Sequence, residues 1–235
     1  ATPATWSFDQ VVHVGGGGSD TIAGLQAWRA RAGGPLEQRI ALTTTSADLL
    51  AGKCARSLGT CGPNGTCRDN DGLLRRQSAV VVMRDNTCVA RRYLDARLEV
   101  VATDLAVGAD GELAVVGWTN EPGFEVRAAF QPELSGPWTL PRAPSDGFFR
   151  LYDGTTLDVL QSSFLGGAGR SPTGGLPDVP FAIAHDKGRR YVTVGRTHSP
   201  DFPTANLPPG WVGVPLEEGR SHGFIASIDT DLISL

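Results

Sequence analysis

An internal repeat constrains the fold of this 235-residue chain more than any other feature. Residues 105–124 (LAVGADGELAVVGWTNEPGF) align with residues 183–202 (IAHDKGRRYVTVGRTHSPDF) at a constant offset of 78, which places Gly117 on Gly195. Both segments contain an apolar stretch, a turn with Asp and Gly, and a second stretch in which apolar and polar residues alternate. Because Asp and Gly accept the positive φ angles of tight turns, each segment is predicted to be a β-hairpin.

A second hairpin unit repeats as well. Residues 145–167 (SDGFFRLYDGTTLDVLQSSFLGG) pair with residues 221–235 (SHGFIASIDTDLISL) and, more loosely, with residues 78–95 (SAVVVMRDNTCVARRYLD). The two hairpins in succession make a four-stranded unit of roughly 70–80 residues, which is typical of a β-propeller blade. The predicted fold class is therefore all-β, with a single β-propeller-like domain over residues 1–235.

Part of the chain resembles a known family. Residues 164–167 (FLGG), 181–197 (FAIAHDKGRRYVTVGRT) and 201–204 (DFPT) are similar to the bacterial secreted β-propeller repeats called SBBP. Blades of that family typically read YLGG, then AIAVDxxGNxYVTGxT, then DFPT. The unit around Trp118 fits this pattern moderately, and the unit at residues 40–49 fits it poorly. The resemblance implies a propeller fold and a secreted setting, and it brings no catalytic residues with it.

The predicted strands are too few for a closed ring. The chain would open near Trp6 in the second strand of one blade and end at Leu235 within another, which gives about three to four blades. Natural propellers have four or more. We therefore expect unpaired strand edges at residues 6–14 and 225–235, where another chain, or sequence outside this segment, would complete the ring.

Two stretches resemble calcium-binding sequences. Residues 12–22 (VHVGGGGSDTI) contain a single copy of the nonapeptide pattern GGxGxDx followed by an apolar residue. A calcium β-roll needs this pattern in tandem, and the glycines align with residues 166–167 after a predicted strand, so a backbone turn is favoured. Asp69, Asn70 and Asp71 resemble half of another calcium loop, but its bidentate Glu is missing. A polar turn is the favoured interpretation there, with calcium as the alternative and no other cofactor predicted.

The four cysteines, Cys54, Cys61, Cys67 and Cys88, lie within a window of 35 residues. Their spacing contains no CxxC pair, which argues against a zinc site. The surrounding segment is polar and rich in glycine, so it needs covalent links in order to be ordered. We predict a disulfide-stapled loop insertion at residues 52–72 between blades, with two disulfides formed in an oxidising compartment. The three possible pairings stay open, and reduced thiols are the alternative.

Three tryptophans are candidates for a binding surface. Trp118 is predicted at the exit of a blade's fourth strand, and Trp138 and Trp211 lie in loops rich in Pro and Gly. Loop tryptophans stack on sugars or anchor protein interfaces. The alternative is that each ring packs within its own loop.

The net charge of the chain and its sequence motifs argue against several classes of function. The formal net charge is −4 without a basic stripe, which argues against nucleic-acid binding, and no apolar run reaches the length of a membrane helix. No nucleophile elbow, P-loop or zinc-protease motif occurs, and the four histidines show no metal-ligand spacing, so catalysis has no positive evidence. The N-terminal ATPATWSF is typical of a mature end left by signal-peptide cleavage.

Two functions follow from these observations. The first is a non-catalytic bacterial propeller, secreted or on the cell surface, with the periplasm as an alternative location. It would act as a structural or interaction subunit that associates with a protein partner or with itself through its terminal strands. The second is a carbohydrate-binding or carbohydrate-active propeller.

Overall fold

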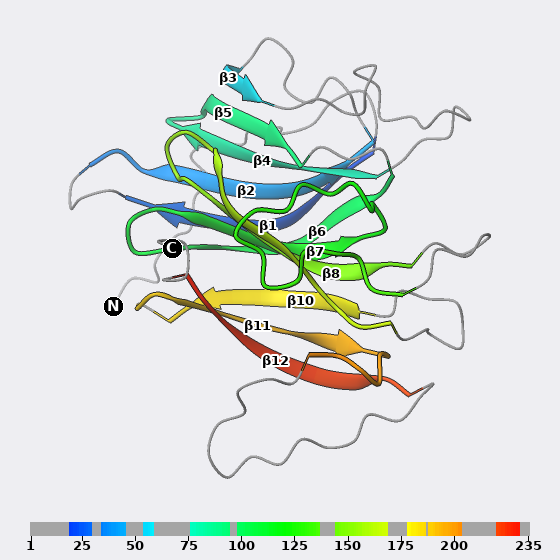
Figure 1. Ribbon diagram of the computed structural model, residues 1–235. Helices are drawn as coiled ribbons and strands as arrows, with labels where there is room; N and C mark the ends of the chain where they lie inside the picture. Colours follow the sequence, from blue (N-terminus) through cyan, green and yellow to red (C-terminus); the bar gives the residue numbers. More distant parts are fainter. Residues whose placement is uncertain are drawn as a thin grey trace, which may run out of the picture.

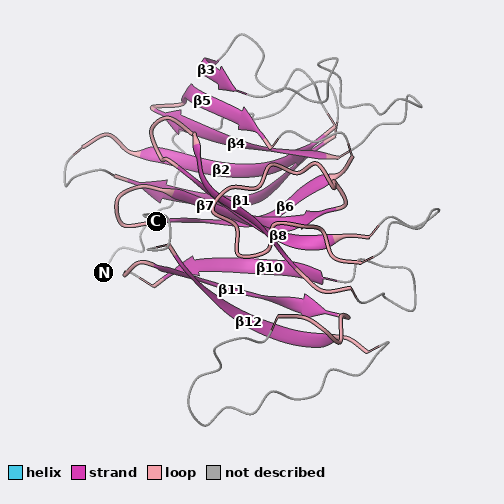
Figure 2. Ribbon diagram, in the orientation of Figure 1, coloured by secondary structure: helices cyan, strands magenta, loops and turns pink. Residues whose placement is uncertain are grey.

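The computed structural model of the protein consists of β-strands and loops, and its described residues contain no helix (Figures 1 and 2). The structure describes residues 19–29, 34–45, 54–58, 76–94, 98–136, 144–168, 178–186, 188–203 and 220–230. Over these ranges the predicted all-β fold class is confirmed.

The strands form three sheets, which follow one another from top to bottom in Figure 1. The first sheet has the strand order β1 (Asp20–Trp28), β2 (Glu37–Thr44), β4 (Gln77–Arg84), β5 (Thr87–Tyr93) and β3 (Cys54–Leu58). The second has the order β6 (Val100–Val107), β7 (Leu113–Thr119), β8 (Asp146–Tyr152) and β9 (Val159–Leu165). The third has the order β10 (Asp178–His185), β11 (Arg190–Thr197) and β12 (His222–Asp229). All neighbours are antiparallel except β3, which runs parallel to β5.

The repeat seen in the sequence corresponds to a repeated strand register. Pairing of β6 with β7 begins at Val100 and Thr119, and pairing of β10 with β11 begins at Asp178 and Thr197, which preserves the offset of 78. The first strand of each sheet has a register shift at the same place, three residues after the pairing starts. A bulge at a fixed position sets which side chains point to which face. The first two strands of the three sheets are therefore equivalent position by position.

The hairpins are grouped into sheets differently from the prediction. Trp118 was expected at the exit of a fourth strand, but it lies in β7, the second strand of its sheet, which pairs directly with β8. Each hairpin closes through a local turn, so the sequence indicates where the hairpins lie. It does not indicate which of two successive hairpins contributes the first two strands of a sheet. The predicted grouping was shifted by one hairpin.

The same shift changes the place of the cysteine-containing segment. Residues 52–72 were predicted between two repeat units, but they lie between β2 and β4, which are neighbours within the first sheet. The strand pairing thus places this segment within one sheet and not between two sheets. Of this segment the structure describes residues 54–58, which form the outer strand β3.

Two turns show why the hairpins close where they do. Asp85 and Asn86 connect β4 with β5 and have φ angles of 48° and 62°, as the two central residues of a type I′ turn require. The turn lies within residues 78–95, which the sequence repeat predicted to be a hairpin. After β8, Oδ1 of Asp153 accepts the backbone N–H groups of Thr155 and Thr156 at 2.8 and 2.6 Å. These hydrogen bonds hold the pKa of Asp153 below its usual value and fix the turn toward β9.

Two hydrophobic cores lie on opposite faces of the second sheet. The core shared with the first sheet contains three phenylalanines, and the ring centre of Phe124 lies 5.1 Å from that of Phe148 and 5.7 Å from that of Phe164. The core shared with the third sheet contains Phe149 and Tyr191, whose ring centres are 5.8 Å apart. Because successive residues of a strand point to opposite faces, Phe148 and Phe149 belong to different cores. The second sheet is thus the middle layer of the molecule.

Arg150 connects the second sheet with the first through a hydrogen bond. Its guanidinium is buried and donates to the Ser162 hydroxyl at 3.0 Å and to the backbone carbonyls of Leu94 at 3.0 Å and Glu125 at 2.8 Å. It also lies 3.9 Å from the centre of the Phe124 ring. Carbonyl dipoles and a ring face therefore compensate for the loss of water around this charge.

Candidate functional site

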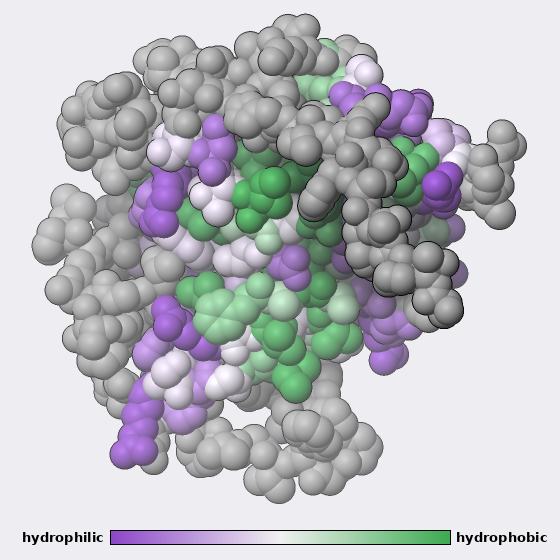
Figure 3. Space-filling view, turned by 180° about the vertical axis from the view of Figure 1, so that it is seen from behind, coloured by the Kyte–Doolittle hydropathy of each residue, from purple (hydrophilic) through white to green (hydrophobic). Residues whose placement is uncertain are grey.

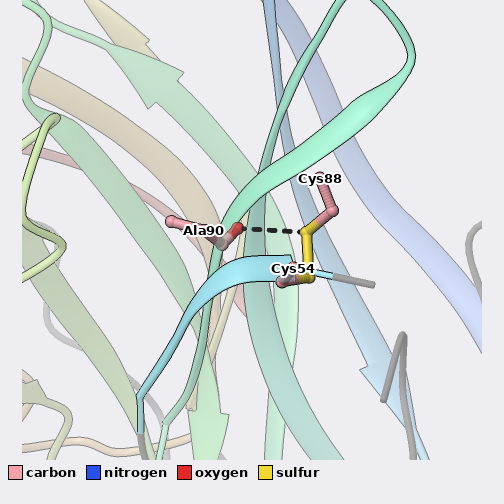
Figure 4. Close-up of a disulfide and its surroundings, with 3 residues drawn as sticks. All are labelled: Cys54, Cys88 and Ala90. Atoms are coloured by element: carbon pink, nitrogen blue, oxygen red, sulfur yellow. Dashed lines mark hydrogen bonds between the residues drawn. A yellow bond between two sulfur atoms is a disulfide. The ribbon is translucent and has the colours of Figure 1, made fainter. Parts of the chain in front are cut away.

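Two of the four predicted disulfide cysteines meet in the structure. Cys54 in β3 and Cys88 in β5 form a disulfide with a Cα–Cα distance of 4.5 Å (Figure 4). The Cys88 sulfur lies 3.7 Å from the carbonyl oxygen of Ala90, and because a disulfide sulfur carries no hydrogen this is a contact without a donated proton. The bond fastens the outer edge of the first sheet. Cys61 and Cys67 lie outside the described residues.

Of the predicted aromatic and calcium-binding residues, the structure describes only Trp118. Trp118 is only 5% exposed, and the guanidinium of Arg76 lies 5.1 Å from the centre of its ring. Its ring belongs to the interior and presents no face for stacking on a sugar. The remaining candidates lie outside the described residues, so their roles stay predictions: Trp138, Trp211, Asp69, Asn70 and Asp71.

Buried polar groups cluster where β9 connects with β10. Asp178, the first residue of β10, is fully buried, and its Oδ2 accepts the backbone N–H of Gly167 at 3.1 Å and the Ser199 hydroxyl at 2.7 Å. The neighbouring N–H of Ala168 donates to Asp201 at 2.8 Å. A Cβ on Gly167 would lie 2.5 Å from the Asp201 carboxylate, so this turn requires glycine. The glycines within residues 12–18, for which the backbone turn was predicted by alignment with residues 166–167, lie outside the described residues.

A second buried carboxylate lies beside this turn. Asp146, the first residue of β8, is also fully buried, and its Oδ2 accepts the N–H of Ser135 at 2.8 Å and the side-chain amide of Gln131 at 2.9 Å. The pKa of Asp146 is raised to about 7, mainly by burial and to a smaller extent by the negative charge of Asp178, while the hydrogen bonds from Ser135 and Gln131 act in the opposite direction. Burial also raises the pKa of Asp178. Both carboxyl groups serve as acceptors for connecting loops and are inaccessible to a substrate.

One set of equivalent positions differs sharply in exposure among the sheets. In each sheet, the first residue after the bulge pairs with a residue of the second strand, and that residue pairs in turn with a residue of the third strand. The side chains on the second and third strands point to the same face of the sheet. We name this the trailing face, and it comprises Ala41 and Val80 in the first sheet, Val116 and Phe149 in the second, and Val194 and Ile225 in the third. In the first two sheets these side chains are 0% exposed, because the next sheet packs on them. In the third sheet, Val194 is 41% exposed and Ile225 is 70% exposed.

The opposite face shows the reverse pattern. The second residue after the bulged one is Leu25 in β1, Leu105 in β6 and Ile183 in β10, and these three residues define the leading face. Leu105 and Ile183 are 1% and 6% exposed, since each packs against the trailing face of the preceding sheet. Leu25 is 59% exposed, and Ile22 beside it on β1 is 56% exposed. Farther out on the same side of the first sheet Ile40 is only 5% exposed, so the open part of this face is β1.

Five of the seven large apolar side chains that are exposed among the described residues lie on these two open faces: Ile22, Leu25, Phe181, Val194 and Ile225. Figure 3 shows apolar side chains in the middle of the surface opposite to that of Figure 1, flanked by polar ones. On the third sheet the bulged residue Phe181 is 49% exposed and extends the trailing face, and the Arg196 guanidinium lies 5.8 Å from the centre of its ring. An arginine over an aromatic ring at the border of an apolar patch is a common composition for a protein interface.

The sequence analysis missed these faces. It named residues 6–14, which lie outside the described residues, and residues 225–235, which include Ile225, as unpaired strand edges, but it did not identify a sheet face. The repeat alignment does contain a signal, because it places Val194 on Val116. An identical residue at the equivalent position does not reveal that one copy is covered by a neighbouring sheet and the other is not.

Comparison with known proteins assigns no family. No protein-family model matches the chain, and no curated protein matches it. Among the residues that the structure describes, no helix could span a membrane. The same residues contain no group of three or more His, Cys, Asp or Glu side chains placed to hold a metal ion. The two open sheet faces are therefore the feature on which a functional proposal can rest.

Proposed function

We propose that this protein is a non-catalytic structural and interaction module, built from blades of the β-propeller type, whose open sheet faces are covered by protein in its assembly. The observation that carries the proposal is the contrast between equivalent residues: Phe149 is 0% exposed and Ile225 is 70% exposed. Both side chains are large and apolar and occupy equivalent positions in the repeat, but the one in the second sheet is buried and the one in the third sheet is exposed. Scattered surface leucines and isoleucines are ordinary, but a whole packing face without cover marks an interaction site.

The architecture supports the propeller assignment. The three sheets are stacked face to face, and each begins with an equivalent bulged hairpin. The stack buries the leading face of one sheet on the trailing face of another, as successive propeller blades do. The resemblance to SBBP repeats is in line with the same fold.

A secreted or cell-surface bacterial location is part of the proposal. The Cys54–Cys88 disulfide fits an oxidising compartment, because thiols are kept reduced in the cytosol. The SBBP resemblance points to the same setting. Sugar binding and carbohydrate chemistry find no support among the described residues, since Trp118 and the buried pair Asp146 and Asp178 are inaccessible.

Light scattering after size exclusion tests the interaction role. We expect the native chain to exceed its monomer mass of 24.8 kDa at tens of micromolar, and Ile225→Asp to reduce this association. Val126→Asp is the matched control, because Val126 is 38% exposed but lies outside both open faces. A chain that stays monomeric over the whole concentration range, with Ile225→Asp indistinguishable from native, would refute the proposal.

A further inference from the structure

We propose that the trailing face of the third sheet is covered by the leading face of a second copy of this chain, in a head-to-tail dimer. The inference rests on the proposed interaction role and goes beyond it by naming the occupant and the contact. The two residues at its centre are Ile225 of one copy and Leu25 of the other.

The first step is the packing rule inside the chain. The trailing face of the first sheet, with Val80, packs on the leading face of the second sheet, with Leu105. The trailing face of the second sheet, with Phe149, packs on the leading face of the third sheet, with Ile183. The chain thus contains the same kind of contact twice, always between a trailing and a leading face.

The second step concerns which faces remain open. One is a trailing face, on the third sheet, and the other is a leading face, at β1 of the first sheet. Leu25 is similar in size to Ile183, and Ile225 occupies the place of Phe149, so the open pair matches the internal pair in chemistry. A contact between two trailing faces has no counterpart among the described sheets. The packing already present in the molecule therefore favours unlike faces.

The third step is closure. A contact between unlike faces leaves one open face on each partner, and these two are again a trailing and a leading face. If both contacts form, two chains enclose all four open faces in a closed ring. Two chains of three sheets give a ring of six, within the range of about four to eight found for rings of stacked sheets. Unlike contacts close into a ring when their rotation permits and otherwise grow into open filaments.

The side chains around the contact fit this arrangement. Phe181 and Val194 flank Ile225 on the trailing face, and Ile22 flanks Leu25 on the leading face. All five are apolar and more than a third exposed in the single chain. Introducing a carboxylate at the centre of either face would bury an unpaired charge, which weakens association by about 100-fold or more.

Mixing of two variants tests the proposal. We expect the native 235-residue chain to form a dimer, and Leu25→Asp and Ile225→Asp each to be monomeric at the same concentration. An equimolar mixture of the two variants should regain a dimer, because the native trailing face of the first fits the native leading face of the second. Val126→Asp should behave as the native chain does. Masses are measured by light scattering, and circular dichroism with thermal unfolding verifies that each variant is folded.

The other outcomes separate this inference from the proposed function. If Ile225→Asp is monomeric and Leu25→Asp dimerises as native, like faces associate, which overturns the head-to-tail contact but keeps the interaction role. If the mixture fails to associate, the contact between unlike faces is also overturned. If the native chain is monomeric throughout, both proposals fail. Where an aspartate variant does not fold, Leu25→Thr and Ile225→Thr replace the pair, with the same expected pattern and a smaller loss of affinity.

Discussion

The disulfide between Cys54 and Cys88 should contribute about 4 kcal/mol to the free energy of unfolding. The two residues are separated by 34 positions, and closing a loop of that length lowers the entropy of the unfolded chain by about 13 cal/mol/K in the loop-closure model. At 25 °C this corresponds to about 4 kcal/mol. The stabilisation is expected to act on the first sheet, because the bond joins β3 to β5 at its outer edge.

Urea denaturation of a Cys54→Ala/Cys88→Ala double variant measures this contribution. Alanine suits the site because Cys88 is 4% exposed and packs among apolar side chains. Cys61→Ala/Cys67→Ala is the comparison variant, since it removes the other two cysteines, and with them the second predicted disulfide, while leaving this bond intact. We expect the urea midpoint of the Cys54→Ala/Cys88→Ala variant to be lower than that of the native chain. Its m-value should be higher, because the unfolded chain without the disulfide exposes more surface. A loss below about 1 kcal/mol would refute the loop-closure reasoning.

Three further predictions concern buried groups of the middle sheet. The pKa of Asp146 is raised to about 7 from 3.8, so the folded state holds a proton that the unfolded state loses. The stability from this group is complete below about pH 4 and falls by up to about 4 kcal/mol as the pH rises through 7. Asp146→Asn should flatten that dependence in urea denaturation between pH 4.5 and 8, and an unchanged slope would contradict it. Arg150→Met removes the donor to the Leu94 carbonyl and leaves the Glu125 carbonyl with the Ser162 hydroxyl as its donor, and it should cost about 2–3 kcal/mol in thermal or urea unfolding. Arg150→Lys should recover only part of this loss, because an ammonium cannot span the three acceptors of the guanidinium. Gly117→Ala would place a Cβ 2.0 Å from the carbonyl oxygen of Val101 and should cost about 3 kcal/mol in the same assay, whereas Gly123→Ala should cost under about 1 kcal/mol because its nearest neighbour is the end of a flexible side chain.

Local patterns in the sequence predicted several of the hairpins. The hairpin with its turn at Asp85 and Asn86 and the hairpin with its turn at Gly111 lie within the segments that alternation and turn chemistry indicated, whereas β1 was not predicted and β3 lies in the segment predicted to be a loop. The offset of 78 between the two best-matching hairpins is preserved in the register, including the bulge. These features depend on neighbours in sequence, so a single sequence contains the information that determines them.

The grouping of hairpins into sheets could not be predicted in the same way. Whether β7 pairs with β8, or β9 with β10, depends on contacts across loops and between layers. The carboxylates Asp146 and Asp178 show the difficulty, because each lies at the start of a strand and accepts hydrogen bonds from a loop that precedes or follows another strand. Such long-range acceptors have no periodic signal. The burial of Trp118 was missed for the same reason, since only the correct grouping places it inside the molecule.

The exposed faces connect the repeat to the function. In stacked repeat proteins, terminal repeats usually carry polar residues on their outer side, because that side has no neighbour. Neither end of this stack follows that pattern in the described residues: Leu25 is exposed on the first sheet, and Val194 and Ile225 are exposed on the third. Each retains the apolar residue type of the covered position in the repeat. At these positions the outer sheets thus have the composition of interior sheets, and the proposed contact between a trailing and a leading face would cover them as the neighbouring sheets cover Val116, Phe149 and Leu105.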